Sequence, residues 1–539
     1  MPASSYDYII VGAGSAGCTL AHRLTEERGI RVLLLEAGGP DRNPWLHIPL
    51  GWGRVLEKRM DDWMYFAEPE PSVGGRAIEC ARGKVLGGSS SINAMVAVRG
   101  HRLDYQRWAQ SGLPGWSYEN VLPYFRRLES WEGGADEYRG DSGPVTIVTS
   151  DYPDPLVEAY IAAGLEAGHP RTPDYNGAEQ HGFCRAQSTI RNGRRCSTAV
   201  AYLRPALARP NLTLHMHALA TRLRFSGNRA VGIEYERNGY PMRAEATREV
   251  ILCGGVINSP HLLMLSGIGD PEALRAHDIA VHTALPGVGR NLQDHVSVGV
   301  SYQRAAPGPF HHHMRLDRIT RELARCYFLG QGFATGLPHG LMAFLKSDPA
   351  AAMPDVQILF HAAPAGANFY APPFLPPFAD GFGSRAVLLR PQSRGHLRLR
   401  SRDPRQKIAI HQNFLTAPED WAALRRGVHM VREIGTRPAL RPFIEKEIGF
   451  GPGRATDEAI DAHIRATAAT AHHPLGTCKM GPETDPMAVV DPTLRVRGTE
   501  GLRVVDGAVM PDLVGGNINA PIIMIAERAA DLIRGRIAG

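Results

Sequence analysis

The sequence lacks several features that mark other classes of protein. Its seven cysteines are odd in number and include no C-x-x-C pair, so they indicate reduced thiols in a cytoplasmic protein, without a disulfide framework or a metal motif. No apolar run reaches about 18 residues, which excludes an ordinary membrane-spanning helix. No basic and apolar leader precedes Tyr6, so no secretion signal is expected. The chain has neither a fixed-period repeat nor a low-complexity tract, which argues against a solenoid or a disordered linker.

The sequence also lacks a strong excess of charge of one sign. The formal net charge of +6 is small for 539 residues, and no nucleic-acid partner is implied. Hydrophobic residues make up 43% and charged residues 21%, which is ordinary for a globular protein with a sizeable core. The length exceeds the size at which one hydrophobic core stops growing, so two domains are expected.

Closely spaced glycines follow an apolar run near the start of the chain. The run 8–11 predicts a buried parallel strand, and the glycines after it open a helix. Glycine lets the backbone approach a pyrophosphate, while the helix N-terminus adds unpaired N–H groups and the positive end of a dipole. The residues predicted to form this cradle are Gly12, Gly14, Ser15, Ala16 and Gly17.

An acid stands at the end of the next predicted strand. Residues 32–35 are all apolar, and Glu36 follows them about 20 residues after the last glycine of the cradle. A carboxylate here can accept hydrogen bonds from ribose hydroxyls and repels the additional phosphate of NADP. Local sequence therefore predicts NAD or FAD without separating the two, against the plainer alternative of a tight turn and a solvated strand end.

Longer motifs carry a family resemblance. GKVLGGSSSINAMVAVRG spans 83–100 and GGVINSPHLLMLSGIG spans 254–269, and PGVGRNLQDH, RPQSRGHLRLRSRDP and LRVVDGAVMP follow further along. Over almost its whole length the sequence resembles the glucose-methanol-choline (GMC) oxidoreductases, which are FAD enzymes that typically act on alcohols. Val256 replaces the usual alanine, a minor departure that concerns local packing.

The resemblance implies an α/β fold, α+β overall, with two interleaved domains. A Rossmann-like FAD-binding domain is expected over 1–155, 211–300 and 480–539. The substrate domain, expected over 156–210 and 301–479, is implied to be a mostly antiparallel sheet with helices.

Two short stretches show the two-residue period of half-buried strands. Leu397 and Leu399 alternate with polar residues, and Ile408 and Ile410 repeat the pattern nearby. The resemblance assigns both to the antiparallel sheet, one face of which is implied to close over the flavin ring.

The C-terminal motifs carry the predicted chemistry. His473 in HPLGT matches the family's active-site histidine, and Asn517 in GGNINAP matches its partner. A neutral imidazole can take the proton of an alcohol at physiological pH, and an amide can donate a hydrogen bond to the alcohol oxygen. His472 is left out of the catalytic set because the motif singles out the residue before the proline. Asn519 is expected to contact the flavin.

Further flavin contacts follow from the resemblance. Some relatives attach FAD covalently through a histidine directly before the Asn93 position, where this chain has Ile92, so noncovalent FAD is expected. No metal is expected. The implied contacts beyond the cradle are Glu36, Ala37, Gly83, Gly88, Asn93, Ala94, Met95, Val96, Ala220, Asp506 and Ala508.

Two other segments invite functional interpretations. Arginines at 315, 318, 321 and 325 share one face of a predicted basic amphipathic helix, 315–327. A lid helix packed on the substrate domain is the favoured interpretation; a peripheral contact with an anionic inner-membrane face, where a quinone could be reduced, stays open. The adjacent histidines 311–313 are expected in a solvated loop, since they lack defined metal-ligand geometry.

These observations together predict FAD-dependent oxidation of a primary alcohol to an aldehyde, with a non-oxygen acceptor such as a quinone. The motifs look most like choline and aliphatic alcohol dehydrogenases. No aromatic cage for a quaternary ammonium is identifiable, so the alcohol stays open. The alternatives are an oxidase that reduces oxygen to peroxide, an FAD-containing hydroxynitrile lyase, and an NAD-dependent reductase that fits Glu36 but not the other motifs. The oligomeric state is not predicted.

Overall fold

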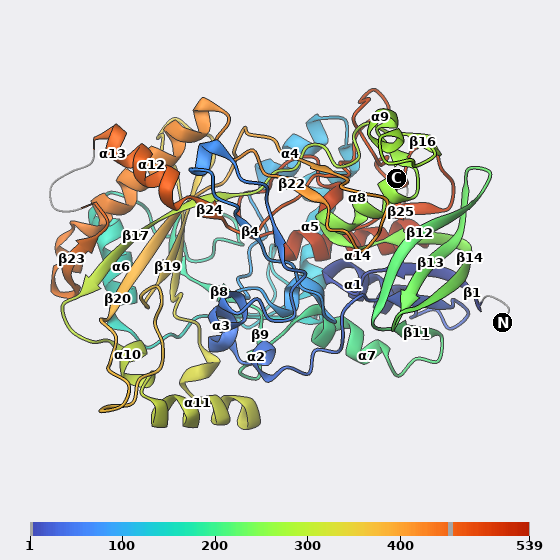
Figure 1. Cartoon of the computed structure of the whole chain (residues 1–539). Coiled ribbons are helices and arrows are strands. Elements are labelled where there is room, and N and C mark those ends of the chain that lie inside the picture. The colour runs from blue at the N-terminus through green and yellow to red at the C-terminus, as the bar shows by residue number, and fades with distance from the viewer. Residues whose placement is uncertain (1–3, 451–455, 538–539) are drawn as a thin grey trace.

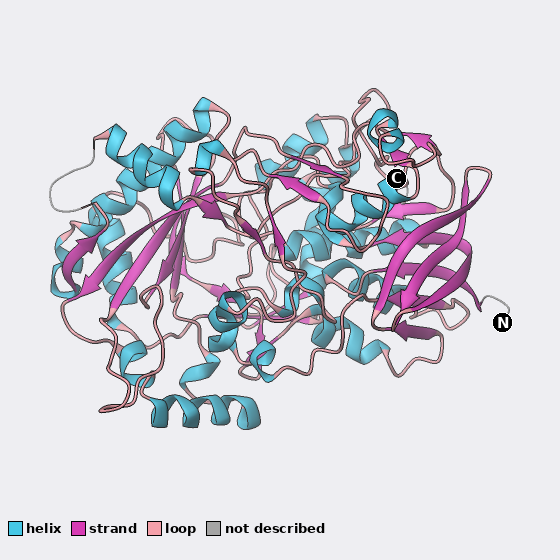
Figure 2. Cartoon of the chain, viewed as in Figure 1, coloured by secondary structure: helices cyan, strands magenta, loops and turns pink. Residues whose placement is uncertain are grey.

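The computed structural model describes residues 4–450 and 456–537. Two seven-stranded sheets lie toward opposite ends of the molecule, and helices and long loops fill the space between them (Figures 1 and 2). The predicted α/β class is confirmed.

The first sheet contains the nucleotide-binding strands. Its order is β11-β2-β1-β14-β13-β12, and β25 pairs with the end of β14. The pairs β11–β2, β2–β1, β1–β14 and β14–β25 are parallel, whereas β12 and β13 continue the sheet in antiparallel fashion. The strands are β1 (Ser4–Val11), β2 (Val32–Leu35), β11 (Leu212–His215), β12 (Ala218–Ser226), β13 (Arg229–Arg237), β14 (Tyr240–Leu252) and β25 (Leu502–Val504).

Apolar runs become central strands because both faces of this sheet are covered. Ile9, Ile10 and Leu33 are fully buried. Helices α1 (Ser15–Leu24) and α14 (Asn519–Ile533) pack together beside the sheet although they lie at opposite ends of the sequence (Figure 1). The first and last motifs are thereby brought into one domain.

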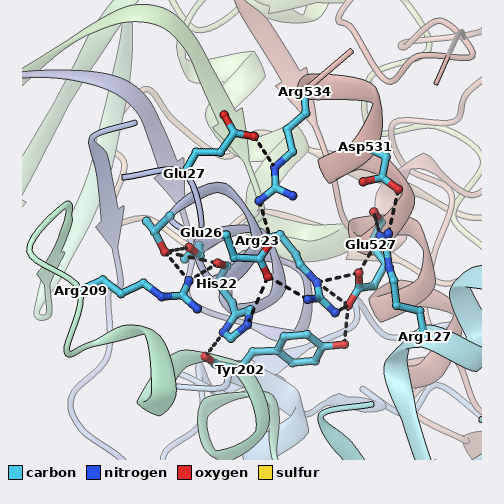
Figure 3. Close-up of polar contacts among 12 residues, drawn as sticks. His22, Arg23, Glu26, Glu27, Arg127, Tyr202, Arg209, Glu527, Asp531 and Arg534 are labelled. Carbon is cyan, nitrogen blue, oxygen red and sulfur yellow. Dashed lines mark hydrogen bonds and ion pairs between the residues drawn. The ribbon is translucent and has the colours of Figure 1, made fainter. Parts of the chain in front are cut away.

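A buried carboxylate fastens these helices. Glu527 on α14 accepts hydrogen bonds from Arg23 of α1 at 2.9 Å and from the Tyr202 hydroxyl at 2.8 Å, and it pairs with Arg127 of α5 at 2.7 Å (Figure 3). Its side chain is 0% exposed, so these partners replace all of its hydration. At the exposed end, Glu26 accepts from Arg534 at 3.0 Å.

The second sheet is antiparallel in every described pairing. Its order is β23-β17-β20-β19-β18-β7, and β24 also pairs with β17. Residue 300, where the sequence places a domain boundary, lies inside β17. The strands are β7 (Gly182–Arg185), β17 (Val296–Arg304), β18 (Leu341–Leu345), β19 (Val356–His361), β20 (Gly381–Leu388), β23 (Ile444–Ile448) and β24 (Ala469–Thr470).

The two faces of this sheet differ. Val298, Val300 and Ala386 point to one face and share a core cluster with the buried side of α12 (Pro418–Gly435). Alternation sends Gln357 and Arg385 to the opposite face. Met342 and Phe344 lie on the same face as Gln357 and Arg385. They pack against Val96, which belongs to the predicted flavin segment, and against Val98.

The strand assignment at 397–410 needs correction. β21 (His396–Arg398) and β22 (Ala409–His411) pair with each other as a separate two-stranded sheet. Leu397, Ile408 and Ile410 are buried in the core of the first domain. Alternation predicted half-buried strands but cannot specify the sheet that a strand joins.

The helix predicted at 315–327 is α11 (Leu316–Leu329). Ile319 and Cys326 on one face are buried, Leu323 packs with Cys326 on Ile48, and Arg318 is exposed. No helix in the described ranges is both long enough and apolar enough to cross a membrane.

The prediction of a solvated loop at 311–313 is wrong. These histidines belong to α10 (Pro309–His313), and His311 is buried against Tyr370, with ring centroids 5.0 Å apart. His313 stacks on Phe333 at 4.0 Å, whereas His312 is exposed. Neighbouring aromatics from distant segments shelter two of the three rings, which the local sequence could not reveal.

Short elements complete the fold and connect the two sheets. The remaining helices are α2 (Pro44–His47), α3 (Trp52–Glu57), α4 (Arg102–Gln110), α5 (Tyr118–Leu128), α6 (Pro155–Glu166), α7 (Arg204–Ala206), α8 (Gly255–Leu265), α9 (Pro271–Arg275) and α13 (Asp457–Thr467). The remaining strands are β3 (Tyr65–Phe66), β4 (Glu79–Cys80), β5 (Glu129–Trp131), β6 (Val145–Thr149), β8 (Gln187–Ser188), β9 (Ile190–Arg191), β10 (Arg194–Arg195), β15 (Ile268–Gly269) and β16 (Thr283–Ala284).

Candidate active site

The glycine turn after β1 is packed too closely for any side chain. A Cβ on Gly17 would lie 1.8 Å from the carbonyl oxygen of Gly12, and one on Gly88 would lie 2.7 Å from the Cα of Gly14. Gly12 has a φ of +104°. Helix α1 begins at Ser15 without a side-chain cap on its first N–H groups. Its N-terminus is therefore bare backbone, as a bound pyrophosphate requires.

Glu36 lies at the end of β2 beside this turn. Its carboxylate accepts hydrogen bonds from the backbone N–H groups of Ala13 at 2.9 Å and Gly38 at 2.7 Å. Burial raises its pKa to about 7, although these N–H donors oppose the shift. The oxygens keep further lone pairs for ribose hydroxyls.

A cavity of about 560 Å³ runs along the carboxyl ends of the parallel strands. Its size and its backbone-lined floor fit a dinucleotide. The predicted residues that line it are Gly12, Gly14, Ser15, Ala16, Glu36, Ala37, Gly83, Gly88, Ala220 and Asp506. Lining residues that were not predicted include Trp63, Tyr65, Lys84, His217, Cys253, Asn258 and Ser259, of which Lys84, Asn258 and Ser259 lie inside the quoted motifs.

Asp506 holds two loops of the cavity together. Its carboxylate accepts hydrogen bonds from Ser259 Oγ at 2.6 Å, Gly255 N at 2.8 Å and Ala508 N at 2.8 Å. Burial raises its pKa, while these three donors act in the opposite direction. Asp506 therefore joins the start of α8 to the C-terminal motif, and Ala508 is buried behind it.

The segment 93–96 follows a tight turn between the two domains. Asn93 Oδ1 accepts from Met95 N at 3.0 Å and from Arg195 Nη1 at 2.7 Å. Met95 is fully buried with a φ of +59°, a left-handed conformation that is rare for this residue. Ile92 packs among Leu46 and other apolar side chains.

Asn519, at the start of α14, accepts a hydrogen bond from Ser15 Oγ at 2.7 Å. This contact ties the last helix to the first turn of α1. Asn519 therefore lies at the pyrophosphate end of the cradle.

His473 and Asn517 meet although 44 residues separate them. Asn517 Nδ2 lies 2.9 Å from His473 Nε2. Asn517 Oδ1 accepts from Gln357 Nε2 at 3.1 Å, which orients the amide with its NH₂ group toward the imidazole. Residues from a loop after β24, the loop before α14 and the strand β19 thus converge.

A second histidine fixes the tautomer of the first. His295 Nε2 lies 3.0 Å from the carbonyl oxygen of Leu389, which can only accept, so this nitrogen carries the proton. Burial lowers the pKa of His295 to about 4, leaving its Nδ1 as an acceptor. His473 Nδ1 lies 3.0 Å from that atom and must therefore be the donor. The lone pair of neutral His473 is consequently on Nε2, toward Asn517.

Burial, followed by the nearby His295, lowers the pKa of His473 well below its usual value. Asp294 accepts from the backbone N–H of His473 at 2.8 Å and so anchors the loop. His472 faces another way, with its Nε2 3.6 Å from Glu79. His295 and Gln357 were not predicted as site residues; His295 lies in the motif PGVGRNLQDH, whereas Gln357 carries no sequence signal.

A strand–glycine–helix cradle joined to a buried imidazole–amide pair defines a dinucleotide-dependent oxidoreductase. Comparison with known proteins specifies the class further. The models of the N- and C-terminal domains of the GMC oxidoreductases match residues 6–297 and 391–526, and the chain belongs to this family. It is an FAD-dependent enzyme that acts on CH–OH donors.

Relatives of known name align over nearly the whole chain. The oxygen-dependent choline dehydrogenase of Stenotrophomonas maltophilia (strain K279a) is 44% identical over 538 residues, covering 99% of this chain and 95% of its own. The crystal structure of pyridoxine 4-oxidase from Mesorbium loti has a TM-score of 0.88 at 33% identity and covers 99% and 100% of the two chains. An Aspergillus oryzae formate oxidase variant, studied for FAD modification, has a TM-score of 0.90 at 26% identity, covering 99% and 98%.

Proposed function

We propose that the enzyme oxidises a primary alcohol to an aldehyde. When bound, FAD supplies the two-electron acceptor that receives the hydride from the carbinol carbon. His473 Nε2 takes the hydroxyl proton, and Asn517 Nδ2 donates a hydrogen bond to the same oxygen. The observation that carries this proposal is the 2.9 Å contact between these two atoms, since a hydroxyl oxygen that takes the place of this hydrogen bond meets both a base and a donor.

The surrounding residues prepare this chemistry. His295 holds the protonated Nδ1 of His473, so that the basic nitrogen faces Asn517. Burial of both imidazoles keeps them neutral and limits water access. Ile92 offers no nucleophile to the flavin, so we propose that FAD is held noncovalently by the cradle residues and by the segment 93–96.

Replacing His473 with alanine tests the proposal. We expect His473→Ala to keep its FAD and to show anaerobic flavin reduction by an alcohol that is slower by about 10²–10⁴-fold, because the base is removed. Stopped-flow absorbance of the flavin measures this rate, and FAD release on denaturation gives the occupancy. Reduction at an unchanged rate would remove His473 from the role of base.

The same experiment separates the alternatives. A hydroxynitrile lyase would not bleach its flavin with any alcohol. We propose that the reduced enzyme passes its electrons to a non-oxygen acceptor such as a quinone. We therefore expect a quinone to reoxidise the flavin faster than air-saturated buffer does. Rapid reoxidation by oxygen with formation of peroxide would identify an oxidase instead.

The route of the electrons also bears on α11. Its packing through Ile319 and Leu323 supports the lid interpretation, while Phe328, at 73% exposure, and Leu329, at 65%, extend from its last turn. Peripheral contact with an anionic inner-membrane face remains the alternative within this proposal, in an otherwise cytoplasmic enzyme. Co-sedimentation with anionic liposomes at low salt decides between them.

A further inference from the structure

An arginine lies on the sheet face that carries the catalytic neighbourhood. Arg385 is opposite Leu359 in the β19–β20 ladder, and Gln357 is opposite Val387. Gln357 and Arg385 are thus diagonal neighbours on one face, about 7–8 Å apart. Since Gln357 donates to Asn517, Arg385 is the diagonal neighbour of a residue that contacts the proposed catalytic pair.

The guanidinium has few partners. Arg385 donates through Nε and Nη2 to Ser297 Oγ, at 3.0 and 2.8 Å, and through Nη2 to Ser297 O at 3.3 Å. Nη1 makes no hydrogen bond, and no Asp or Glu forms an ion pair with Arg385, within residues 4–450 and 456–537. The residue is only partly covered, and desolvation lowers the pKa of its guanidinium.

Several other buried arginines of this chain are paired with carboxylates, although Arg195 and Arg528 form no ion pair within the described residues. Arg139, Arg304 and Arg503 pair with carboxylates at 2.9, 2.6 and 2.6 Å. Arg195 has no carboxylate, but it donates to the carbonyl oxygens of Leu46 and Asn93, both at 2.6 Å. Arg385 has one neutral serine, so its charge is less compensated than those of the three paired arginines and of Arg195.

The charge of Arg385 reaches the neighbouring histidines. Burial, with Arg385 as the next cause, lowers the pKa of His361 to about 4. Burial, Arg82 and then Arg385 lower the pKa of His472 to about 3. His361 stacks with Trp52 at 5.8 Å and contacts His339 at 4.6 Å. The guanidinium therefore lies near aromatic and neutral imidazole side chains, with Arg82 as a second cation beside His472.

We propose that Arg385 binds a carboxylate of the substrate, so that the preferred alcohol is a hydroxy acid. Nη1 donates to no described residue, and its two N–H groups can form charge-assisted hydrogen bonds with a carboxylate. The carboxylate oxygen of the substrate would take the place of the Asp or Glu partner that Arg385 lacks. A quaternary ammonium would instead meet an uncompensated cation at this position.

The sheet geometry limits where the acid group is attached. Gln357, which holds the amide of Asn517, and Arg385 occupy diagonal positions of one face, so we infer that the carboxylate is separated from the carbinol by a few bonds. This deepens the proposed alcohol oxidation and rests on it. Because the contact is remote from the reacting bond, its loss should raise KM more than it lowers kcat.

The test compares matched alcohols with the FAD-loaded enzyme. ω-Hydroxyalkanoates of three to six carbons are set against the corresponding ω-hydroxyamides and choline. We expect kcat/KM for the best acid to exceed that of its amide by about 10–100-fold, as for one charge-assisted hydrogen-bonded pair, and choline to be poorer still. Arg385→Gln should abolish this preference while leaving the amide rate within about threefold, and Arg385→Lys should restore part of it.

A binding measurement and a control variant complete the design. Alkanoates without a hydroxyl should compete with the acid substrate and perturb the flavin spectrum of the wild type, but not that of Arg385→Gln. Arg398→Gln, which removes an exposed arginine on β21, should behave like the wild type. Equal rates for acid and amide, unchanged in Arg385→Gln, would overturn the inference while alcohol oxidation stands. Absence of flavin reduction by every alcohol would overturn the proposed function instead.

Discussion

At the residue scale, the site is a line of hydrogen bonds in which one backbone carbonyl determines the state of the base. The carbonyl oxygen of Leu389 fixes the proton of His295 on Nε2, and the acceptor Nδ1 of His295 fixes the proton of His473 on Nδ1. Asn517 faces the remaining lone pair, on His473 Nε2. No charge is needed anywhere along this line. His295 is therefore a positioning residue, because it acts on the substrate through His473.

Removal of the acceptor on His295 should misorient the base. We expect His295→Leu to slow flavin reduction by about 10–100-fold, as for other groups that orient a functional imidazole. His295→Gln offers an acceptor oxygen and a donor NH₂ and should recover most of the rate. Stopped-flow pH profiles distinguish this from a packing defect: the leucine variant should show a shifted apparent pKa, and the glutamine variant should not. Equal losses in both variants would indicate packing alone.

At the scale of elements, the helices beside the first sheet depend on contacts between segments remote in sequence. Helices α1, α5 and α14 meet at Glu527, whose partners Arg23, Arg127 and Tyr202 come from three other places in the chain. Helical periodicity alone predicts each helix but not this meeting point. The cradle of α1 is thus held in place by the last helix.

Truncating Glu527 should destabilise this junction strongly. We expect Glu527→Ala to lower the free energy of unfolding by about 3–5 kcal/mol, because two arginines are left near a site that has lost its buried carboxylate. Glu26→Ala, at the exposed end of the same network, should cost less than about 1 kcal/mol. Guanidinium titrations of the FAD-saturated protein compare the two variants. Similar midpoints for both would contradict the distinction.

At the scale of the whole molecule, many imidazoles are buried in neutral form. Their pKa values are lowered, chiefly by burial, so below about pH 6.5 the unfolded chain binds protons that the folded chain does not. Glu36 and Asp294, whose burial raises their pKa values to about 7 and about 6, have the opposite effect but are fewer. The histidines concerned are the buried His261, His295, His339 and His473 and the partly covered His361 and His472.

Stability should therefore fall on mild acidification. We expect the guanidinium midpoint of unfolding to be lower at pH 5 than at pH 7, since each fully buried histidine contributes up to about 2 kcal/mol over this interval. Saturating FAD and constant ionic strength are needed at both pH values. Proton uptake on unfolding at pH 5, measured by potentiometry, provides an independent check. A higher midpoint at pH 5 would show that the carboxyl groups dominate.

The parts of this architecture that depend on local geometry are predictable from sequence. The parts that depend on tertiary contacts are not. Apolar runs and glycine spacing correctly locate β1, β2 and α1, because strand and turn geometry is local. The sheet partner of β21 and the shelter of His311 depend on tertiary contacts and were predicted wrongly. Gln357 and Arg385 stand in ordinary strand positions, and only the β19–β20 register places Arg385 diagonal to Gln357, which contacts Asn517.

The position of β25 and α14 has a consequence during synthesis. Val250–Leu252 pairs with β1 on one side and gains its second partner strand only when Leu502–Val504 is available, and α1 gains its contact with α14 only when this last helix has been made. At about 5–20 residues per second, a ribosome needs roughly half a minute to a minute and a half to travel from the second strand to these elements. Throughout that interval the nascent chain displays an incomplete apolar edge. Cells that make this enzyme must therefore shield it, so its yield should rise and fall with the supply of holdase chaperones.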